Sequence, residues 1–169
     1  MRRVTLLTAL LLATTVANGE ARAMEPQSQS ATTIGPANPA LAEGATALDA
    51  GRIEDGIRLT LDGLKAPTDT SDRAAGYSNL CAGYALLKQW DEALPHCNTS
   101  LGLNKNSWRT FNNRAAVYVA KGQYELAIAD LRAGLEIAPN SRTLLESLRI
   151  VQQNKRLYGA RSRSSVRSP

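Results

Sequence analysis

The stretch GQYELAIADLRAGLEIAPN, residues 122–140, repeats the pattern of KQWDEALPHCNTSLGLNKN, residues 88–106. The two copies align without a gap at a spacing of 34 residues, so that Trp90 falls on Tyr124. Within each copy the apolar residues recur at helical spacing, which predicts a helix with one apolar face. A pattern repeated at a fixed period of this length is typical of arrays in which each unit packs on the next.

Helical spacing also continues outside these two copies, and no stretch shows the sustained alternation of a strand. Three further sets of apolar residues lie on single helical faces: Tyr77, Leu80, Cys81, Tyr84 and Leu87; Phe111, Ala115 and Tyr118; Leu144, Leu148 and Val151. The turns around Gln89 and Gly122 are only two or three residues long, so the paired helices are expected to lie antiparallel. Ser141 is positioned to cap the last helix. We predict an all-α chain of seven helices.

These hairpins of about 34 residues resemble the tetratricopeptide repeat. The fingerprint of that repeat is a large residue, a Leu-Gly pair, a Tyr, then an Ala, an aromatic residue and a Pro. At these positions the last unit holds Phe111, Arg114-Ala115, Tyr118, Ala127, Leu131 and Pro139. The middle unit holds Tyr77, Leu80-Cys81, Tyr84, Ala93, Cys97 and Lys105. The first unit holds Ala40, Glu43-Gly44, Ala47, Gly56 and Thr60. The resemblance implies a right-handed superhelical array of three antiparallel helix hairpins, closed by a C-terminal capping helix.

The resemblance also divides the chain into segments. The repeat domain is predicted over residues 39–158, with units at about 39–70, 71–106 and 107–140 and a capping helix at 141–158. Gly51 lies 37 residues before its counterpart Lys88, so the first connection is expected to carry about three extra residues. Residues 24–38 are rich in Gln, Ser, Thr and Pro, which predicts a flexible leader, and residues 159–169 are predicted to be a flexible basic tail.

Residues 1–23 have the pattern of a secretory signal peptide. Two arginines precede an apolar run over residues 4–17, and Ala21 and Ala23 then offer a cleavage site before Met24. A membrane anchor is the alternative, but the apolar run is short for crossing a bilayer. We therefore expect an exported protein, periplasmic if the source is bacterial and otherwise secreted.

Positive charge is concentrated at the two ends of the chain. Residues 24–154 contain 12 basic and 14 acidic residues, whereas residues 155–169 contain five basic residues and no acidic one. The net charge of +5 is therefore no argument for a nucleic-acid partner. An alternative function follows from the basic end, which could hold the protein to anionic lipid, lipopolysaccharide or cell-wall polymer by charge.

The sequence offers little material for catalysis. His96 is the one histidine of the chain, and with Cys81 and Cys97 it supplies three metal ligands at most, without the spacing of a zinc module. No serine or cysteine has a histidine placed to activate it, and no glycine-rich loop is present to hold a phosphate. We expect a non-enzymatic protein without metal or cofactor.

The resemblance implies that the first helix of each unit lines a concave groove that binds a peptide or helix of a partner protein. The predicted groove residues are Leu41, Leu48, Ser78, Asn79, Ala82, Arg109, Asn112, Asn113 and Ala116. Relatives that grip the acidic C-termini of heat-shock chaperones use a clamp of basic and amide groups, which Asn79, Arg109 and Asn113 match in part. The first unit holds Leu41 and Ala45 at its clamp positions, so half of the clamp is absent. Asn79 and Asn113 also match an asparagine of the repeat consensus, so a purely structural role is an alternative for them. A separate alternative is that the leader of this chain occupies the groove.

Cys81 and Cys97 are predicted to form a disulfide. They lie at equal distances from residue 89, the centre of a turn, and residues equally far from such a turn are level in an antiparallel hairpin. Cys81 also takes the place where the repeat requires a small residue. Export to an oxidising compartment favours the bond. The alternative is two buried thiols acting as small apolar residues.

Overall fold

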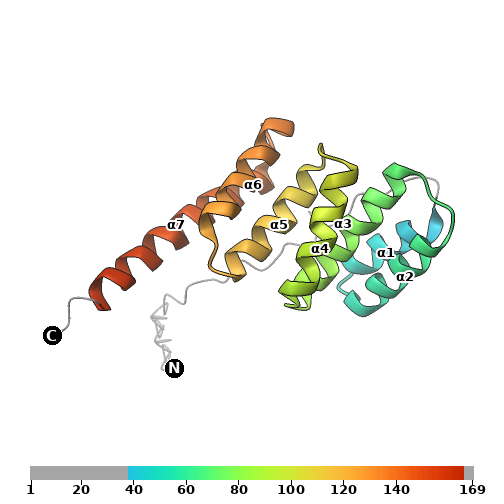
Figure 1. Cartoon of the computed structure of the whole chain (residues 1–169), viewed down its shortest axis with the longest axis horizontal. Helices are drawn as coiled ribbons and strands as arrows, with labels where there is room; N and C mark the ends of the chain where they lie inside the picture. The colour runs from blue at the N-terminus through green and yellow to red at the C-terminus, as the bar shows by residue number, and fades with distance from the viewer. Residues whose placement is uncertain (1–37, 166–169) are drawn as a thin grey trace, which may run out of the picture.

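The computed structural model describes residues 38–165, with side chains through Tyr158, and that part of the chain is entirely helical (Figure 1). The helices are α1 (Pro39–Asp49), α2 (Ile53–Lys65), α3 (Thr70–Leu86), α4 (Trp90–Leu103), α5 (Trp108–Ala120), α6 (Tyr124–Ile137) and α7 (Arg142–Ser165). The predicted all-α fold of three hairpins and a closing helix is confirmed. The predicted signal peptide, residues 24–37 of the leader and residues 166–169 lie outside the described residues.

The hairpins pack side by side in chain order. Within each hairpin the two helices contact each other, and the second helix of each packs on the element that follows: α2 on α3, α4 on α5, and α6 on α7. The first helices α1, α3 and α5 also contact one another in order, and they form what we call the inner layer. Figure 1 shows the resulting elongated array, with α1 and α2 at one end and α7 at the other.

The three hairpin turns share one backbone geometry. Each has a single residue in the left-handed region, at Gly51 (φ 75°), Lys88 (φ 59°) and Gly122 (φ 73°). In the last turn, Gly122 N–H donates to the Val119 carbonyl at 2.9 Å and Gln123 N–H to the Tyr118 carbonyl at 2.8 Å. These bonds satisfy the free carbonyls at the end of α5, which is the usual role of a left-handed residue after a helix.

The extra residues predicted for the first connection are instead part of α3. The links between α2 and α3 and between α4 and α5 are each four residues long, whereas α3 has 17 residues and α5 has 13. Asp69 begins α3 earlier because its side chain accepts a hydrogen bond from Asp72 N–H at 2.7 Å. The placement of the insertion in the connection was therefore wrong: an N-cap residue converts it into an additional helical turn.

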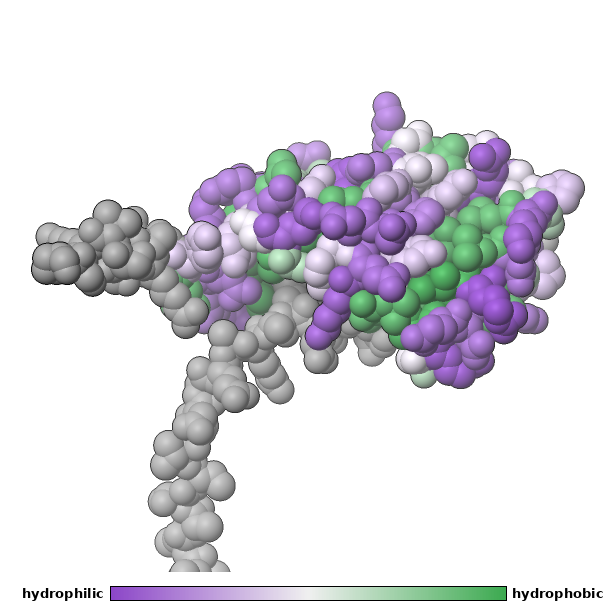
Figure 2. Space-filling view, turned by 60° about the horizontal axis from the view of Figure 1, so that its bottom comes forward, coloured by the Kyte–Doolittle hydropathy of each residue, from purple (hydrophilic) through white to green (hydrophobic). Residues whose placement is uncertain are grey.

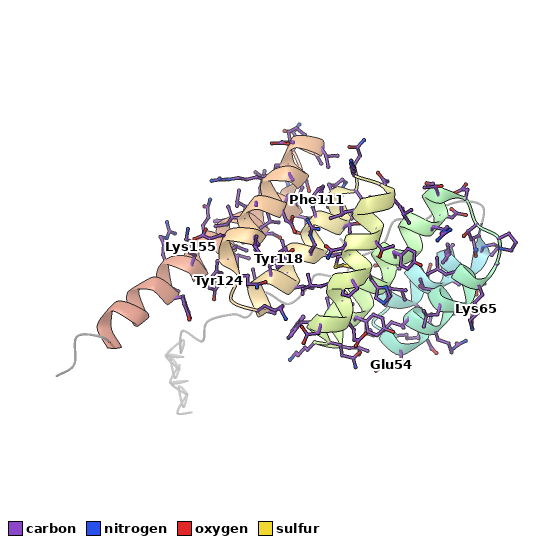
Figure 3. The ribbon with its side chains drawn as sticks, viewed as in Figure 1. Glu54, Lys65, Phe111, Tyr118, Tyr124 and Lys155 are labelled. Atoms are coloured by element: carbon purple, nitrogen blue, oxygen red, sulfur yellow. A yellow bond between two sulfur atoms is a disulfide. The ribbon has the colours of Figure 1, made fainter. Side chains whose placement is uncertain are left out.

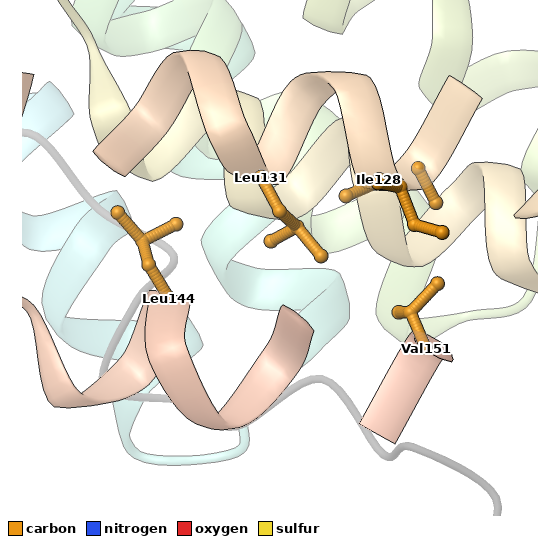
Figure 4. Packing of buried hydrophobic residues seen from close by; sticks show 6 residues of the cluster. Ile128, Leu131, Leu144 and Val151 are labelled. Atoms are coloured by element: carbon orange, nitrogen blue, oxygen red, sulfur yellow. The ribbon is translucent and has the colours of Figure 1, made fainter. Parts of the chain in front are cut away.

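The capping helix packs on the last hairpin as predicted. Leu144 and Val151 are fully buried against Ile128 and Leu131 of α6, as Figure 4 shows. The side chain of Ser141 accepts a hydrogen bond from the amide of Leu144 at 3.4 Å, so the expected cap is present. This helix therefore covers the apolar face that the last hairpin would otherwise expose.

Two predicted boundaries differ from the structure. The leader was predicted to reach residue 38, but Asn38 caps α1: its side chain accepts from Leu41 N–H and donates to the Gly63 carbonyl at 2.8 Å. The capping helix was predicted to end at residue 158, but α7 continues to Ser165. The first seven residues of the predicted flexible tail are thus helical in this structure.

A partly buried ion pair joins the two helices of the last hairpin, and its arginine also reaches the middle hairpin. Arg114 of α5 donates to both carboxylate oxygens of Asp130 on α6, at 2.8 and 2.7 Å, and to Asn98 of α4 at 2.8 Å. Its guanidinium also lies 5.8 Å from the ring centres of Phe111 and Tyr118 (Figure 3). Hydrogen bonding to Asp130 raises the pKa of Arg114 above its ordinary value. Arg114 thus connects three helices at a position where the repeat usually has leucine.

The predicted cysteine pair is bonded in the structure. Cys81 of α3 and Cys97 of α4 form a disulfide across a Cα–Cα distance of 4.9 Å, and both residues are fully buried. The bond links the two helices of the middle hairpin.

Candidate peptide-binding groove

The nine predicted groove residues all lie on the inner layer, distributed over α1, α3 and α5. Eight of them are buried: Leu41, Leu48, Ser78, Asn79, Ala82, Asn112, Asn113 and Ala116. Arg109 is half-buried. The structure thus places these residues on neighbouring helices, but most of their side chains pack between helices rather than face outward. Their contact with a partner stays a prediction.

Three of the polar groove residues form hydrogen bonds that link an inner helix to another helix. Asn79 of α3 donates from Nδ2 to the Leu41 carbonyl of α1 at 3.3 Å. Thr110 of α5 donates to Ser78 of α3 at 2.9 Å. Ser147 of α7 donates to Asn112 of α5 at 2.9 Å. Buried polar groups are costly without such partners, so these contacts also fix how each helix sits against the next.

The amide oxygen of Asn79 is a special case. Asn79 is fully buried, and its Oδ1 is the one buried side-chain oxygen or nitrogen without a hydrogen-bond partner among the described residues. An unpaired buried acceptor costs about 1–3 kcal/mol. Because this oxygen is enclosed between helices, the missing bond lowers the stability of the inner layer and does not offer a contact at its surface.

Sequence reasoning missed a cluster of hydroxyl groups around Thr110, which includes the groove residue Ser78. Thr110 lies within hydrogen-bond distance of Ser100 (3.1 Å), Ser107 (2.7 Å) and Ser78, and Ser100 donates to the Ala74 carbonyl at 2.9 Å. The signal in the sequence was small polar residues at positions that the apolar stripes would otherwise occupy. This cluster ties α3, α4 and α5 together.

Arg109 provides the cation in the predicted groove. Its guanidinium carbon lies 4.6 Å from the centre of the Trp108 ring, a cation–π arrangement that holds the side chain. At the two clamp positions of the first unit, Leu41 and Ala45 are fully buried. The groove therefore has one fixed positive charge, on α5, and no cation at the clamp positions of α1.

A second recess, which the sequence did not reveal, lies between α2 and the end of α3. It is an open hollow of about 340 Å³ lined by Ile57, Leu61, Tyr84 and Leu87, with Glu54, Arg58, Asp62 and Lys65 at its edge. Glu54 and Lys65 mark this end of the molecule in Figure 3, and Figure 2 shows apolar surface there among hydrophilic residues. Such a surface can contact an apolar side chain of a partner.

His96 is held between two tyrosines on the same face of α3. Its ring lies 5.2 Å from the ring of Tyr84 and 6.0 Å from that of Tyr77, close to parallel with both. Burial lowers the pKa of His96, and the nearby Glu92 carboxylate opposes that shift. Among the described residues, no group of three or more His, Cys, Asp or Glu side chains could hold a metal ion.

None of the described helices combines the length and the apolar character that crossing a membrane requires.

Comparison with solved structures decides the fold. The described helices resemble the Hsp90 co-chaperone Cns1 from Saccharomyces cerevisiae, with a TM-score of 0.69 and 19% identity over 76% of this chain and 42% of Cns1. They also resemble the first TPR domain of Spaghetti (RPAP3) bound to the HSP90 peptide SRMEEVD, with a TM-score of 0.62 and 23% identity over 69% of this chain and 92% of that domain. The chain has the fold of a tetratricopeptide repeat domain.

Sequence comparison reaches less far than the comparison with solved structures. No protein-family profile matches the chain. Human peptidyl-prolyl cis-trans isomerase FKBP4 is 30% identical over 91 residues, which is 54% of this chain. The chain spans about a fifth of the length of the curated relatives it matches. The matched segment is a small part of these relatives, so their name does not describe this chain. That the protein is non-enzymatic stays a prediction.

Proposed function

We propose that this tetratricopeptide repeat domain is a non-enzymatic interaction scaffold that binds a peptide or helix of a partner protein along its inner layer. The observation that supports it most is the match to nearly the whole length of a domain that holds a peptide, 92% of that chain. Arg109, half-buried on α5, is the charged group that this layer offers to such a ligand.

The ligand is expected to differ from the acidic chaperone tails. The clamp of basic and amide groups that grips such tails is incomplete here, because Leu41 and Ala45 supply only apolar groups on α1. An extended or helical segment with apolar side chains and few charges suits these residues better.

Site-specific crosslinking tests this proposal. A photoreactive residue is placed at Arg109 in the inner layer, at Leu61 in the α2–α3 hollow, or at the exposed Arg132 of α6 as a control. We expect a partner protein to be crosslinked from position 109 and not from position 132. Equal capture from both positions, or none from 109, contradicts the proposal. If the partner is crosslinked from position 61 alone, the α2–α3 hollow and not the inner layer is the binding surface.

Arg109→Ala is the matching affinity test. Because Arg109 makes no ion pair with another described residue, its loss should weaken partner binding with little change in melting temperature. Asn113→Ala is a poorer probe, since Asn113 is 4% exposed and its replacement disturbs packing as well.

We also propose that the domain acts after export. The signal-peptide pattern of residues 1–23 supports this proposal. Cell fractionation with and without these residues tests it. Recovery of both forms in the same cytosolic fraction would contradict it.

A further inference from the structure

Three arginines form a row along the solvent-facing side of α7. Arg142, Arg149 and Arg156 follow one another at seven-residue intervals, and all three are exposed. Seven residues complete nearly two helical turns, so successive arginines lie about 10.5 Å apart and drift around the helix by only about 20° each time. Arg163 continues the same series in the sequence, within the helical span of α7.

The row faces away from the array. The buried residues Leu144 and Val151 occupy the opposite side of α7, where they pack on α6. Of the three arginines, only Arg149 has an ion pair among the described residues, with Glu146 of the same helix. Both members of that pair are more than half exposed, and exposed pairs of this kind contribute little stability. Arg142 and Arg156 are therefore available to a partner directly, and Arg149 once a partner carboxylate replaces that of Glu146.

α7 also extends beyond the surface that supports it. It has 24 residues, against 11–17 in the helices of the hairpins. Among its described side chains, which end at Tyr158, Val151 is the last that is fully buried. Lys155 pairs with Glu125 at 2.7 Å, and the Tyr158 ring lies 5.8 Å from that of Tyr124, at the point where α7 leaves α6 (Figure 3). A free helical extension is only marginally stable in water, so a partner lying along it would stabilise it.

We propose that this arginine row is a docking surface for an acidic amphipathic helix of another protein, lying alongside α7. Two helices have the same rise per residue, so carboxylates at seven-residue intervals in the partner meet each arginine in turn. Arginine binds a carboxylate through two parallel hydrogen bonds, which fixes the register as well as the charge. Leu145 and Leu157, each 50% exposed on either side of the row, provide apolar contact at its edges.

The arrangement of α7 suits a helix better than a lipid surface. A helix that lies on a bilayer has apolar residues at the centre of its contact face and basic residues at the edges. In α7 the order is reversed, because the arginines form the centre and the exposed leucines lie beside them. This surface is separate from the proposed groove, so either proposal can fail without the other.

Charge reversal of the row in the full chain tests the proposal. The row variant carries Arg142→Glu, Arg149→Glu and Arg156→Glu. The control variant carries Arg73→Glu, Lys105→Glu and Arg132→Glu, three exposed positions on other parts of the chain with the same change in net charge. The melting temperatures of both variants are measured first to show that they are folded.

The probe is a labelled 24-residue helical peptide with four glutamates at seven-residue intervals, and its binding is followed by fluorescence anisotropy at physiological salt. We expect the natural chain and the control variant to bind it with Kd values within about threefold of each other, and the row variant to bind at least tenfold more weakly. A peptide of the same composition with its glutamates distributed around the helix should also bind at least tenfold more weakly. Replacing the four glutamates by arginines should restore binding to the row variant.

Three results would overturn the proposal. No binding of the glutamate peptide to the natural chain excludes an acidic-helix site. If the natural chain binds the two glutamate peptides equally, or if the row and control variants lose the same affinity for the first peptide, charge attraction without a docking register explains the binding. The third result combines two observations: phosphatidylglycerol vesicles retain the natural chain but not the row variant, and the natural chain binds both glutamate peptides equally. It would assign the row to an anionic surface instead.

Discussion

Lys88 has a left-handed backbone, with φ 59°, where the two equivalent turns have glycine. A side chain in this region has a steric cost of about 1–2 kcal/mol, which glycine avoids. Glycine also makes the unfolded chain more flexible, and this offsets part of the gain in stability. We expect Lys88→Gly to stabilise the protein by about 0.5–1 kcal/mol, measured by urea unfolding.

The reverse change at the next turn is the matched control. Gly122 has φ 73° and no atom within 4 Å of where a Cβ would lie, so Gly122→Ala tests backbone conformation alone. It should destabilise the protein by about 1 kcal/mol. If both substitutions change the free energy of unfolding in the same direction, the turns are not equivalent.

His96 should make stability depend on pH. Burial holds its pKa below the ordinary value near 6.5, with Glu92 opposing, so the unfolded chain binds the proton more readily than the folded one. The free energy of unfolding should therefore fall as the pH drops below about 6.5. Urea unfolding between pH 7.5 and 5 measures this slope, and His96→Gln should flatten it.

Carboxylates titrate in a lower range, which separates them from His96. The pKa of Glu146 is lowered by its hydrogen bond with Arg149 and that of Asp62 by Lys65, so their contributions are lost only below about pH 4.5. A slope between pH 7.5 and 5 that persists in His96→Gln would contradict the assignment.

At the scale of single elements, the disulfide joins α3 to α4 across a sequence separation of 16 residues. Closing a loop of this size stabilises a protein by about 3 kcal/mol in the loop-entropy model. Reduction should lower the free energy of unfolding by about that amount. Because both sulfur atoms are buried, Cys81→Ala with Cys97→Ala adds a packing loss and should cost more than reduction. Equal stability of oxidised and reduced protein would contradict the stabilising role, and alkylation of both cysteines in unreduced protein would mean that the bond does not form in solution.

The face of each helix can be tested by adding bulk. Ala127 is fully buried between α5, α6 and α7, so Ala127→Trp should destabilise the protein by about 1–3 kcal/mol. Gln153 is exposed on α7, and Gln153→Trp should change the melting temperature little. Equal thermal shifts from the two substitutions would contradict the packing of α6 and α7.

Sequence periodicity predicted these elements well because turns and apolar stripes are local signals. It misplaced the extra residues of α3 and the end of α7, since both depend on where a helix starts or stops rather than on its period. It also gave no partner for Arg114, because the Asp130 carboxylate comes from a different helix, 16 residues away in the sequence.

At the scale of the whole molecule, α7 is both a cap and an extension. Ending the chain after Asn140 removes Leu144 and Val151 and uncovers Ile128 and Leu131 of α6. Each fully buried side chain of this size contributes about 1.5–3 kcal/mol, so this truncation should abolish cooperative unfolding or cause aggregation. Ending after Tyr158 should leave the melting temperature nearly unchanged. Thermal circular dichroism and size-exclusion chromatography measure both, and a folded monomer ending at Asn140 would contradict the capping role.

The groove was predictable from sequence only as a set of positions. The repeat register places Asn79 and Asn112 on inner helices, but it does not show that their side chains bond to neighbouring helices. Such contacts depend on how close the inner helices approach, which small residues such as Ala82 set in three dimensions. The α2–α3 hollow was not predictable for the same reason, because its walls come from separate hairpins.

The disulfide has a mechanical consequence for the array. If the molecule is pulled by its two ends in optical tweezers, the first and last hairpins lengthen fully, whereas the segment between Cys81 and Cys97 stays closed. At about 3.3–3.6 Å per extended residue, the oxidised chain reaches a contour length roughly 50 Å shorter than the reduced chain. The segment of the middle repeat between Cys81 and Cys97 would thus remain a covalent loop after the rest of the array has unfolded and extended.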